Sequence, residues 1–474
     1  MNEVNEEKQT FRNELATVSK EGKRNWIYPK KPSGRFYNAR TLVSFLLLAI
    51  LIGTPFIKTD GHPYILFDFL NRNFILFGIP FGTHDFHLFV LAMISIIVFI
   101  ILFTVVFGRV FCGWACPQTI FMEMVFRKIE YFIEGDANQQ RQLNKAPWTA
   151  SKIFKKTLKQ SIFFAIAFFI SNIFLSYIIG MDELLKIVTA PPSEHMKGFI
   201  AILIFSGIFY WVFSYFREQA CTIVCPYGRL QGVLLDQDSI VIAYDHVRGE
   251  PRGKLKKNED TSSQGDCIDC HLCVDVCPTG IDIRNGIQLE CVNCTACIDA
   301  CDNVMDKISK PRGLIRYDSL NGITKKIKFR FTPRMMGYSA VLTVLLSVLT
   351  FLLVTRSDFS INILRTPGML YQEQPNDMVS NIYDLNIVNK TFNKADIDIK
   401  LDDVNGELKL IGNKISLAPQ GIADVKFMII LPKADLKKMN TPVTLSIYSN
   451  DKLLKMISTT FLGPVKMKEK TESK

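Results

Sequence analysis

The segment CIDCHLCVDVCP occupies residues 267–278, and the segment CVNCTACIDAC follows at residues 291–301. In each segment two residues separate the first three cysteines from one another, and three residues precede the fourth. Three thiolates of such a loop bind three irons of a cubane, and the fourth cysteine of each run ligates the other cluster. The spacing therefore predicts a ferredoxin module with two [4Fe-4S] clusters.

The same rule divides the eight cysteines into two ligand sets. The first set is Cys267, Cys270, Cys273 and Cys301, and the second is Cys291, Cys294, Cys297 and Cys277. Structural zinc is the alternative, but a zinc site needs only four ligands and rarely uses a third cysteine at this spacing. Acidic neighbours add negative charge near the clusters, which favours low reduction potentials. These neighbours are Asp266, Asp269, Asp275 and Asp299.

The other four cysteines form two CxxxCP motifs, Cys112 to Cys116 before Pro117 and Cys221 to Cys225 before Pro226. If each motif follows a helix end, its cysteines share one helix face at i and i+4, and the proline limits the backbone beyond the second thiol. Four soft sulfurs between two hairpins would suit Cu(I), zinc or a further iron-sulfur centre. Buried free cysteines that serve as small apolar packing residues are the alternative.

Hydrophobic residues make up 48% of the 474 residues, and the mean hydropathy is +0.16. Five apolar runs approach the roughly 20 residues that cross a ~30 Å hydrocarbon core, although the first is somewhat short. They are residues 42–57, 86–107, 161–180, 198–216 and 336–354. The sequence thus predicts five transmembrane helices, with core helices of a soluble protein as the alternative.

Lys and Arg are dense before the first run (Arg35 and Arg40 among them), between the second and third, and between the fourth and fifth. The positive-inside rule places these segments in the cytoplasm of a bacterial cell, bounded by its inner membrane. The ferredoxin module would then be cytoplasmic, where sulfur stays reduced, and the tail after Val354 would be periplasmic. These membrane flanks explain the formal charge of +11 better than nucleic-acid binding does.

The tail alternates apolar and polar residues in short stretches separated by Asn, Asp, Gly and Pro, which predicts a small immunoglobulin-like β-sandwich. The stretches are residues 382–389, 397–401, 408–411, 423–430, 443–448 and 454–462. A further segment, Phe121 to Ile133, has an amphipathic pattern and is expected to lie along the membrane surface. The chain has no Walker loop or dinucleotide fingerprint, so its electrons must come from another protein or a reduced carrier.

The expected fold class is therefore a multi-domain membrane protein, with a five-helix bundle, an inserted ferredoxin module and a C-terminal β-sandwich. The expected division is a cytoplasmic tail, a four-helix membrane region, the ferredoxin-like domain, the fifth transmembrane helix and a periplasmic Ig-like domain. Their limits are 1–40, 41–236, 237–335, 336–355 and 356–474.

The chain resembles one known family over nearly its whole length. The features that carry the resemblance are helical hairpins that close with CxxxCP, the ferredoxin segment with Lys310-Pro311-Arg312-Gly313 after it, a fifth helix and an exported sandwich. This is the cytochrome c oxidase accessory protein family called CcoG, FixG or RdxA. The resemblance implies reduction of Cu(II) to Cu(I) during assembly of the copper-haem centre of cbb3-type oxidase. It also implies that Cys112, Cys116, Cys221 and Cys225 bind or deliver copper. The implied partners are the lipid bilayer, a cytoplasmic electron donor, copper ion or a copper-transport ATPase, and oxidase subunits.

Two other functions compete with a cupric reductase. The CxxxCP motifs are also similar to those of membrane polyferredoxins of the nitrate and nitrous oxide reductase systems, so the chain could relay electrons between a quinol and a partner reductase without copper chemistry. It could also be an assembly scaffold whose exported sandwich binds oxidase subunits.

Overall fold

The computed structural model describes most of the chain, namely residues 16–19, 21–69, 73–254, 264–402, 404–436, 438–449 and 452–464. Parts of the expected cytoplasmic tail, ferredoxin domain and C-terminal domain therefore lie outside the described residues. The described chain forms two compact units. Unit 1 comprises Met1–Pro63 with Val90–Leu349, and unit 2 comprises Tyr64–Phe89 with Thr350–Lys474.

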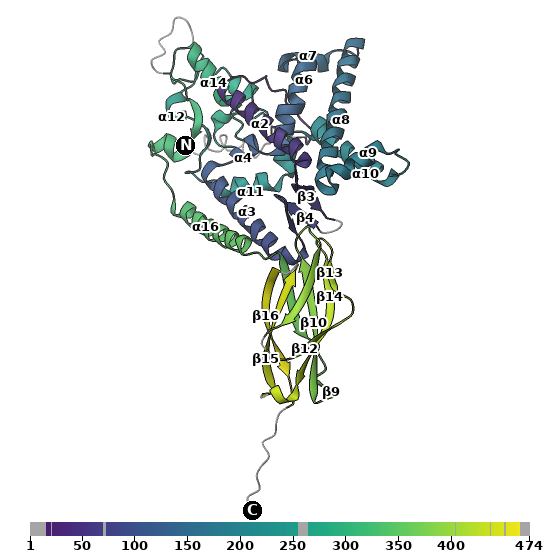
Figure 1. Cartoon of the computed structure of the whole chain (residues 1–474). Helices are drawn as coiled ribbons and strands as arrows, with labels where there is room; N and C mark the ends of the chain where they lie inside the picture. The colour runs from purple at the N-terminus through teal and green to yellow at the C-terminus, as the bar shows by residue number, and fades with distance from the viewer. Residues whose placement is uncertain are drawn as a thin grey trace, which may run out of the picture. The chain divides into compact units, whose positions relative to one another are not determined.

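Five helices in the described residues are long and apolar enough to cross a membrane, which confirms the five expected spans (Figure 1). They are Arg35–Phe56 (α2 and η2), Phe86–Phe107 (α3), Ala150–Ile179 (α8), Met196–Phe216 (α10 and η5) and Pro333–Val354 (α16). Helix α8 begins earlier than expected, where the Thr149 hydroxyl accepts a hydrogen bond from the Lys152 amide at 3.3 Å. Phe45 on α2 is 72% exposed, as expected where lipid and not protein covers a helix.

The ferredoxin segment folds within unit 1 between two antiparallel strands, β6 (Val241–Tyr244) and β7 (Ile315–Asp318). Its helical pieces are α12 (His246–Gly249), α13 (Leu272–Asp275), η7 (Ile283–Asn285) and α14 (Ala296–Lys307), and α15 (Leu320–Lys325) follows β7. Ile242, Leu314 and Met305 are almost fully buried between these elements. Burial of each such side chain contributes about 1.5–3 kcal/mol and holds the cysteine loops in place.

Short elements connect the membrane helices. They are α4 (Val110–Trp114), α5 (Pro117–Thr119), the π-helical η4 (Ile120–Phe126), α6 (Arg127–Glu134), α7 (Ala137–Lys145), α9 (Met181–Thr189), the π-helical η6 (Ala220–Val224) and α11 (Pro226–Leu234). Protein covers much of the segment Phe121 to Ile133, although Phe132 is 90% exposed, and its expected place along the membrane surface stays a prediction. Phe126 stacks on Phe213 with ring centroids 5.0 Å apart, and Glu130 on the other face is 3% exposed.

Unit 2 contains an antiparallel β-sandwich (Figure 1). One sheet has the order β12-β14-β10-β8 with β9 also paired to β10, and the other has the order β13-β11-β15-β16. The strands are β8 (Phe359–Arg365), β9 (Gln372–Gln374), β10 (Met378–Asn389), β11 (Ala395–Leu401), β12 (Glu407–Ile411), β13 (Ile415–Leu417), β14 (Ile422–Pro432), β15 (Asn440–Ser449) and β16 (Lys452–Leu462). All six expected strands are present, and β8, β9 and β13 are additional.

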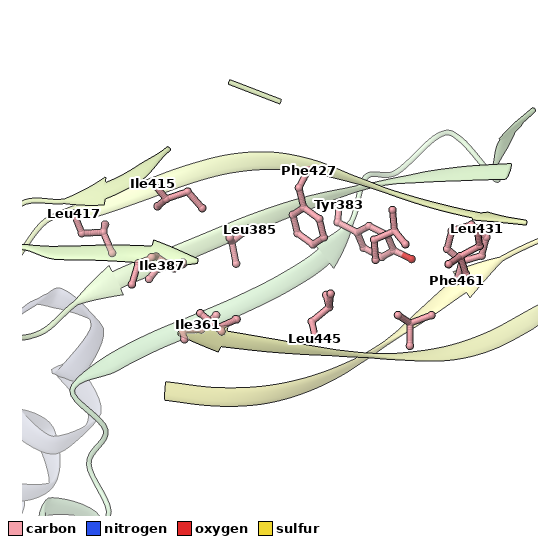
Figure 2. Close-up of a cluster of buried hydrophobic side chains, with 14 of the residues drawn as sticks. Ile361, Tyr383, Leu385, Ile387, Ile415, Leu417, Phe427, Leu431, Leu445 and Phe461 are labelled. Carbon is pink, nitrogen blue, oxygen red and sulfur yellow. The ribbon is translucent and has the colours of Figure 1, made fainter. Parts of the chain in front are cut away.

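The sandwich core consists of alternate side chains from both sheets. Figure 2 shows Tyr383, Phe427 and Leu445 among the apolar side chains between the strands. The rings of Tyr383 and Phe427 stack at 5.3 Å, and the Tyr383 hydroxyl donates to the carbonyl of Thr460 at 3.0 Å. This period-two burial is the pattern from which the sandwich was predicted.

The loop between the first two membrane helices contributes to unit 2. It contains a small sheet of β3 (Ile65–Asp68), β4 (Asn73–Leu76) and β5 (Ile79–Phe81), after the hairpin of β1 (Lys58–Thr59) and β2 (His62–Pro63). Asp85 at its end is 2% exposed and pairs with Arg356 at 2.9 Å and Lys390 at 2.7 Å. These buried ion pairs join the loop to the sandwich, which the sequence did not indicate.

Candidate iron-sulfur and thiol sites

The eight ferredoxin cysteines line two cavities. Cys267, Cys270, Cys273 and Cys301 line one cavity, which has an empty volume of about 370 Å³. Cys277, Cys291, Cys294 and Cys297 line the other, of about 330 Å³, together with Cys273. The fourth cysteine of each run therefore lies with the first three of the other run, as the spacing rule predicts. Four thiols around a cavity are the donor set that a [4Fe-4S] cluster requires, so the residues fit two clusters.

The two cysteine loops share an unusual backbone. Asp269 and Asn293, each two residues after the first cysteine of its run, have φ values of 53°. His271 and Thr295, each one residue after the second cysteine, have φ values of 57° and 68°. L-residues rarely adopt this left-handed region, and surrounding structure must hold them there. The repeat in the sequence is thus also a repeat in conformation, and it curls each loop around its cavity.

Burial raises the pKa of five of the eight ferredoxin cysteines, Cys297 among them, and keeps these thiols protonated in the absence of metal. It raises the pKa of Cys273, Cys291 and Cys301 to about 12 and that of Cys294 to about 11. Iron binding would therefore release protons as the thiols become thiolates. The sites are built for metal-bound sulfur rather than for free thiolate chemistry.

Most of the acidic residues near the first cavity have basic partners. Arg284, which is 9% exposed, donates to Asp282 at 2.8 Å and to Asp269 at 2.5 Å. Asp266 pairs with Arg248 and, at 3.0 Å, with Lys310. These partners offset the negative charge that the sequence suggested would lower the cluster potentials.

The carboxylate of Asp299 has a different partner. It accepts hydrogen bonds from the main-chain amides of Phe36 at 3.2 Å and Tyr37 at 2.8 Å, at the start of α2. Gly34 allows this close approach, because a Cβ there would overlap the Asp299 side chain. A ferredoxin residue thus caps the first membrane helix and stabilises its N-terminus.

The two CxxxCP motifs have the same backbone conformation at their second cysteine. Cys116 and Cys225 are extended, with φ/ψ of −63°/124° and −65°/110°, and each precedes a proline that begins the next helix. The second cysteine of each motif therefore ends its helix, and the sharing of one helix face by the two cysteines stays a prediction. The proline ring disfavours the α conformation in the preceding residue, so each second cysteine leaves the helix.

The four CxxxCP thiols lie in one region and affect one another. Burial raises the pKa of Cys221 to about 12, and Cys116, Cys112 and Cys225 raise it further. Burial also raises the pKa of Cys112. In the described residues, however, no group of three or more His, Cys, Asp or Glu side chains is arranged as a ready metal site. Binding of one ion by several of these thiols would therefore require side-chain movement.

Gln231 on α11 connects the two motifs. Its side-chain oxygen accepts hydrogen bonds from the Cys112 thiol at 3.1 Å and from Arg109 Nε at 3.1 Å. Gln231 is fully buried, and its amide nitrogen donates to the Thr104 hydroxyl at 3.4 Å. Gln231, which follows the second motif in the sequence, therefore holds Cys112, the first cysteine of the first motif.

The first CxxxCP motif packs directly against the second ferredoxin loop. A Cβ on Gly113 would lie 2.5 Å from the carbonyl oxygen of Val292 and 2.7 Å from that of Asn293. Only glycine allows the two backbones to approach this closely. Cys112 and Cys294 also belong to one cluster of buried side chains. Cys112, one of the four CxxxCP thiols, is thus a neighbour of the second cluster cavity.

Two aromatic residues reinforce this contact. The indole nitrogen of Trp114, inside the first motif, donates to the Tyr317 hydroxyl at 3.3 Å. The Tyr317 hydroxyl in turn donates to the Asn293 carbonyl at 3.2 Å. This chain of hydrogen bonds joins the CxxxCP motif, β7 and the second cysteine loop.

Three basic or amide residues at this site were missed as functional candidates: Arg40, Arg109 and Gln231. Arg40 is 3% exposed and Arg109 is 4% exposed, although basic residues flanking an apolar run are expected to face water. Arg40 Nε donates to the Gly113 carbonyl at 2.7 Å. The sequence contains no local signal that separates these arginines from ordinary membrane flanks.

Three family models match the chain. A 4Fe-4S binding domain matches residues 89–133, a 4Fe-4S dicluster domain matches residues 216–320, and the IG-like fold at the C-terminal of FixG matches residues 349–464. The first two models include the CxxxCP motifs as well as the ferredoxin cysteines. The third confirms the predicted immunoglobulin-like domain.

Curated relatives match most of the chain. Protein RdxB of Cereibacter sphaeroides is 36% identical over 81% of this chain and 83% of its own length, and Protein RdxA of the same organism is 37% identical over 62% and 63%. Nitrogen fixation protein FixG of Rhizobium meliloti is 32% identical over 87% of each chain. The chain therefore belongs to the FixG/RdxA family and is a membrane-bound iron-sulfur electron-transfer protein.

Proposed function

We propose that this protein reduces Cu(II) to Cu(I) for assembly of the copper centre of cbb3-type cytochrome c oxidase. The eight ferredoxin cysteines would hold two [4Fe-4S] clusters in the two sets that line the cavities, and these clusters store and release single electrons. The CxxxCP cysteines would bind copper, because thiolates favour Cu(I). A copper-transport ATPase and oxidase subunits would be the partners before and after reduction.

The observation that carries this proposal is the contact between Gly113 and the Val292–Asn293 backbone. It holds Cys112 beside the cysteine loop that contains Cys294. In the proposed reaction Cu(II) gains one electron, and a reduced cytoplasmic carrier protein supplies it through the ferredoxin module. The chain's own residues exclude water, hold the thiols and keep the two centres adjacent.

We also propose an orientation of the chain in the membrane. The ferredoxin domain, residues 237–335, would lie in the cytoplasm of a bacterial cell, and the sandwich, residues 356–474, in the periplasm. The basic flanks of the membrane helices support this orientation. A tag inserted after Lys254 should be accessible only after the inner membrane is broken, and a tag at the C-terminus should be accessible from the periplasm.

The test is a copper titration of the anaerobically reduced protein. Cluster absorbance should return to its oxidised form as Cu(II) is added, with one Cu(I) formed for each electron lost. The Cys112→Ser/Cys221→Ser variant should keep its iron and sulfide but oxidise at least tenfold more slowly. Clusters that stay reduced in the presence of Cu(II) would contradict the proposal. Oxidation by a quinone that is insensitive to this variant would favour the quinol relay.

A further inference from the structure

Within the described part of the chain, two buried arginines beside the CxxxCP motifs form no ion pair with a carboxylate. Of the five buried arginines among the described residues, Arg127, Arg217 and Arg284 form ion pairs with carboxylates. The described residues contain no such ion pair for Arg40 or Arg109. A buried charge without a counter-charge is strongly unfavourable, so these two guanidinium groups need another partner.

Arg109 is held between the two CxxxCP motifs. Its Nε donates to Gln231 at 3.1 Å, and its Nη1 donates to the carbonyl of Leu289. A Cβ on Gly228 would lie 2.8 Å from Arg109 Nη2 and 2.9 Å from the carbonyl oxygen of Cys221. All these contacts are neutral dipoles, which orient the guanidinium without cancelling its charge.

The Cys112 thiol can become anionic, and it shares a hydrogen-bond acceptor with Arg109, because the side-chain oxygen of Gln231 accepts from both at 3.1 Å. Glu290 is also within electrostatic range of Arg109, but burial raises its pKa and the described residues contain no ion pair between the two. The arrangement therefore favours the cysteines over the carboxyl as the partner of Arg109.

Arg40 has the equivalent position at the contact with the ferredoxin loop. Its Nε donates to the Gly113 carbonyl, while its buried Nη2 has no hydrogen-bond partner among the described residues. Through Gly113, whose backbone meets that of Val292 and Asn293, Arg40 lies next to the loop that contains Cys294. It is thus a positive charge with an unused donor between the first motif and the second cysteine set.

We propose that Arg109 and Arg40 are positioning residues that supply the counter-charge of two anionic thiolate–metal centres. Arg109 serves the centre formed by the CxxxCP thiols, and Arg40 serves the cluster held by Cys291, Cys294, Cys297 and Cys277. The Arg109 part rests on the proposed copper function, whereas the Arg40 part requires only the iron-sulfur cluster. Positive charge favours the more negative, reduced state of a cluster, so Arg40 raises the reduction potential on the side that faces the CxxxCP motifs.

The first experiment tests whether the positive charge of Arg109 stabilises copper bound by the CxxxCP thiols. Cu(I) affinity is determined for the full-length protein by competition with a chromophoric Cu(I) chelator. Arg109→Gln should weaken binding at least tenfold, and Arg109→Lys should restore most of it. Gln231→Glu places a carboxylate within reach of Arg109, so it should also weaken Cu(I) binding while raising the melting temperature of the copper-free protein. Wild-type affinity in both Arg109→Gln and Gln231→Glu would overturn this part.

The second experiment tests whether the positive charge of Arg40 raises the reduction potential of one cluster. Redox titration followed by EPR measures the midpoint potential of each cluster. Arg40→Gln should lower the midpoint potential of one cluster and leave the other unchanged, and Arg40→Lys should keep both near wild type. Iron and sulfide analysis will show whether Arg40→Gln has lost its clusters. In that case the Arg40→Lys variant is used instead, and two midpoint potentials that match those of wild type support the role of positive charge at this position. Unchanged potentials in a fully loaded Arg40→Gln protein would overturn the role of Arg40.

A wild-type protein that binds no Cu(I) would overturn the copper proposal and the role of Arg109, but not that of Arg40.

Discussion

The two cysteine systems of unit 1 are both built from sequence repeats, but they balance charge differently. Around the first ferredoxin cavity, Arg284 is shared between Asp269 and Asp282, so the protein supplies both signs of charge. Beside Cys112, Arg40 and Arg109 are buried without an ion pair among the described residues. The difference indicates that the first ferredoxin site is electrostatically balanced before loading, whereas a metal bound by the CxxxCP thiols would bring the negative charge to the other site.

The ferredoxin half of this comparison depends on cross-ligation, and its removal should have the largest effect. Cys277→Ala should destroy the cluster of the second run, which halves the iron content to about four atoms per chain. Adding Cys291→Ala to this variant should cause no further loss, whereas adding Cys267→Ala should remove the remaining iron. Iron and acid-labile sulfide analysis distinguishes the two double variants. The reverse pattern would show that each run binds its own cluster.

A buried ion pair elsewhere in unit 1 is a reference for the unpaired arginines, because its arginine is already paired with a carboxylate. Arg217 forms two hydrogen bonds to Glu130, at 3.1 and 2.8 Å, and Lys159 lies 3.2 Å from the same carboxylate. Glu130→Gln removes the carboxylate that these two cations share and should lower the free energy of unfolding by about 3 kcal/mol, because Lys159 keeps Glu134 at 2.9 Å and Arg217 keeps Glu218 at 3.8 Å. Thermal unfolding in detergent measures the loss.

The pH dependence of this effect has a defined sign. Burial would raise the pKa of Glu130, but Arg217 and Lys159 outweigh it and lower the value to about 2. The carboxylate's contribution is therefore complete above pH ~4.5 and is lost as the pH falls toward 2. The difference in stability between wild type and Glu130→Gln should be constant from pH 6 to 8. A difference that shrinks within this range would contradict the depressed pKa.

Ligand spacing and hydrophobic runs made much of this molecule predictable from its sequence. A cubane imposes fixed distances between sulfurs, so the two cysteine runs specify both cavities without knowledge of the fold. The membrane helices follow from the length of their apolar runs, and six strands follow from the alternation of apolar and polar residues. The extended Cys116 and Cys225 could also have been predicted, because each precedes a proline.

What the sequence concealed depends on contacts between distant segments. Gly113 meets Val292 and Asn293 through backbone atoms, which leave no pattern of side-chain types. Arg40 has the same local surroundings as a solvent-facing flank, yet other segments bury it. Likewise, the loop before Phe86 belongs with the distant sandwich because Asp85 pairs with Arg356 and Lys390. Tertiary packing, rather than local propensity, determined all three.

The contact between the two cysteine systems can be broken by one methyl group. Gly113→Ala would place its Cβ against two carbonyl oxygens of the ferredoxin loop. We expect a loss of about 1–3 kcal/mol in unfolding free energy and slower oxidation of the clusters by Cu(II). Gly207→Ala is the control, since no atom lies within 4 Å of a Cβ there, and it should be neutral or stabilising by up to about 1 kcal/mol. Equal effects of both variants would show that the contact is not tight.

The smallest change removes a hydroxyl at the same contact. Tyr317→Phe keeps the ring but deletes the bonds to Trp114 and to the Asn293 carbonyl, which should cost about 0.5–1.5 kcal/mol for each bond. Because the ring still fills its space, both clusters should assemble, while the second cysteine loop loses one of its fixed contacts with the CxxxCP motif. Trp114→Phe removes only the first bond, so its stability loss should be smaller than that of Tyr317→Phe. If Trp114→Phe were the more damaging, packing of the indole rather than the hydrogen-bond chain would join the two systems. Thermal unfolding of the iron-loaded variants measures this order directly.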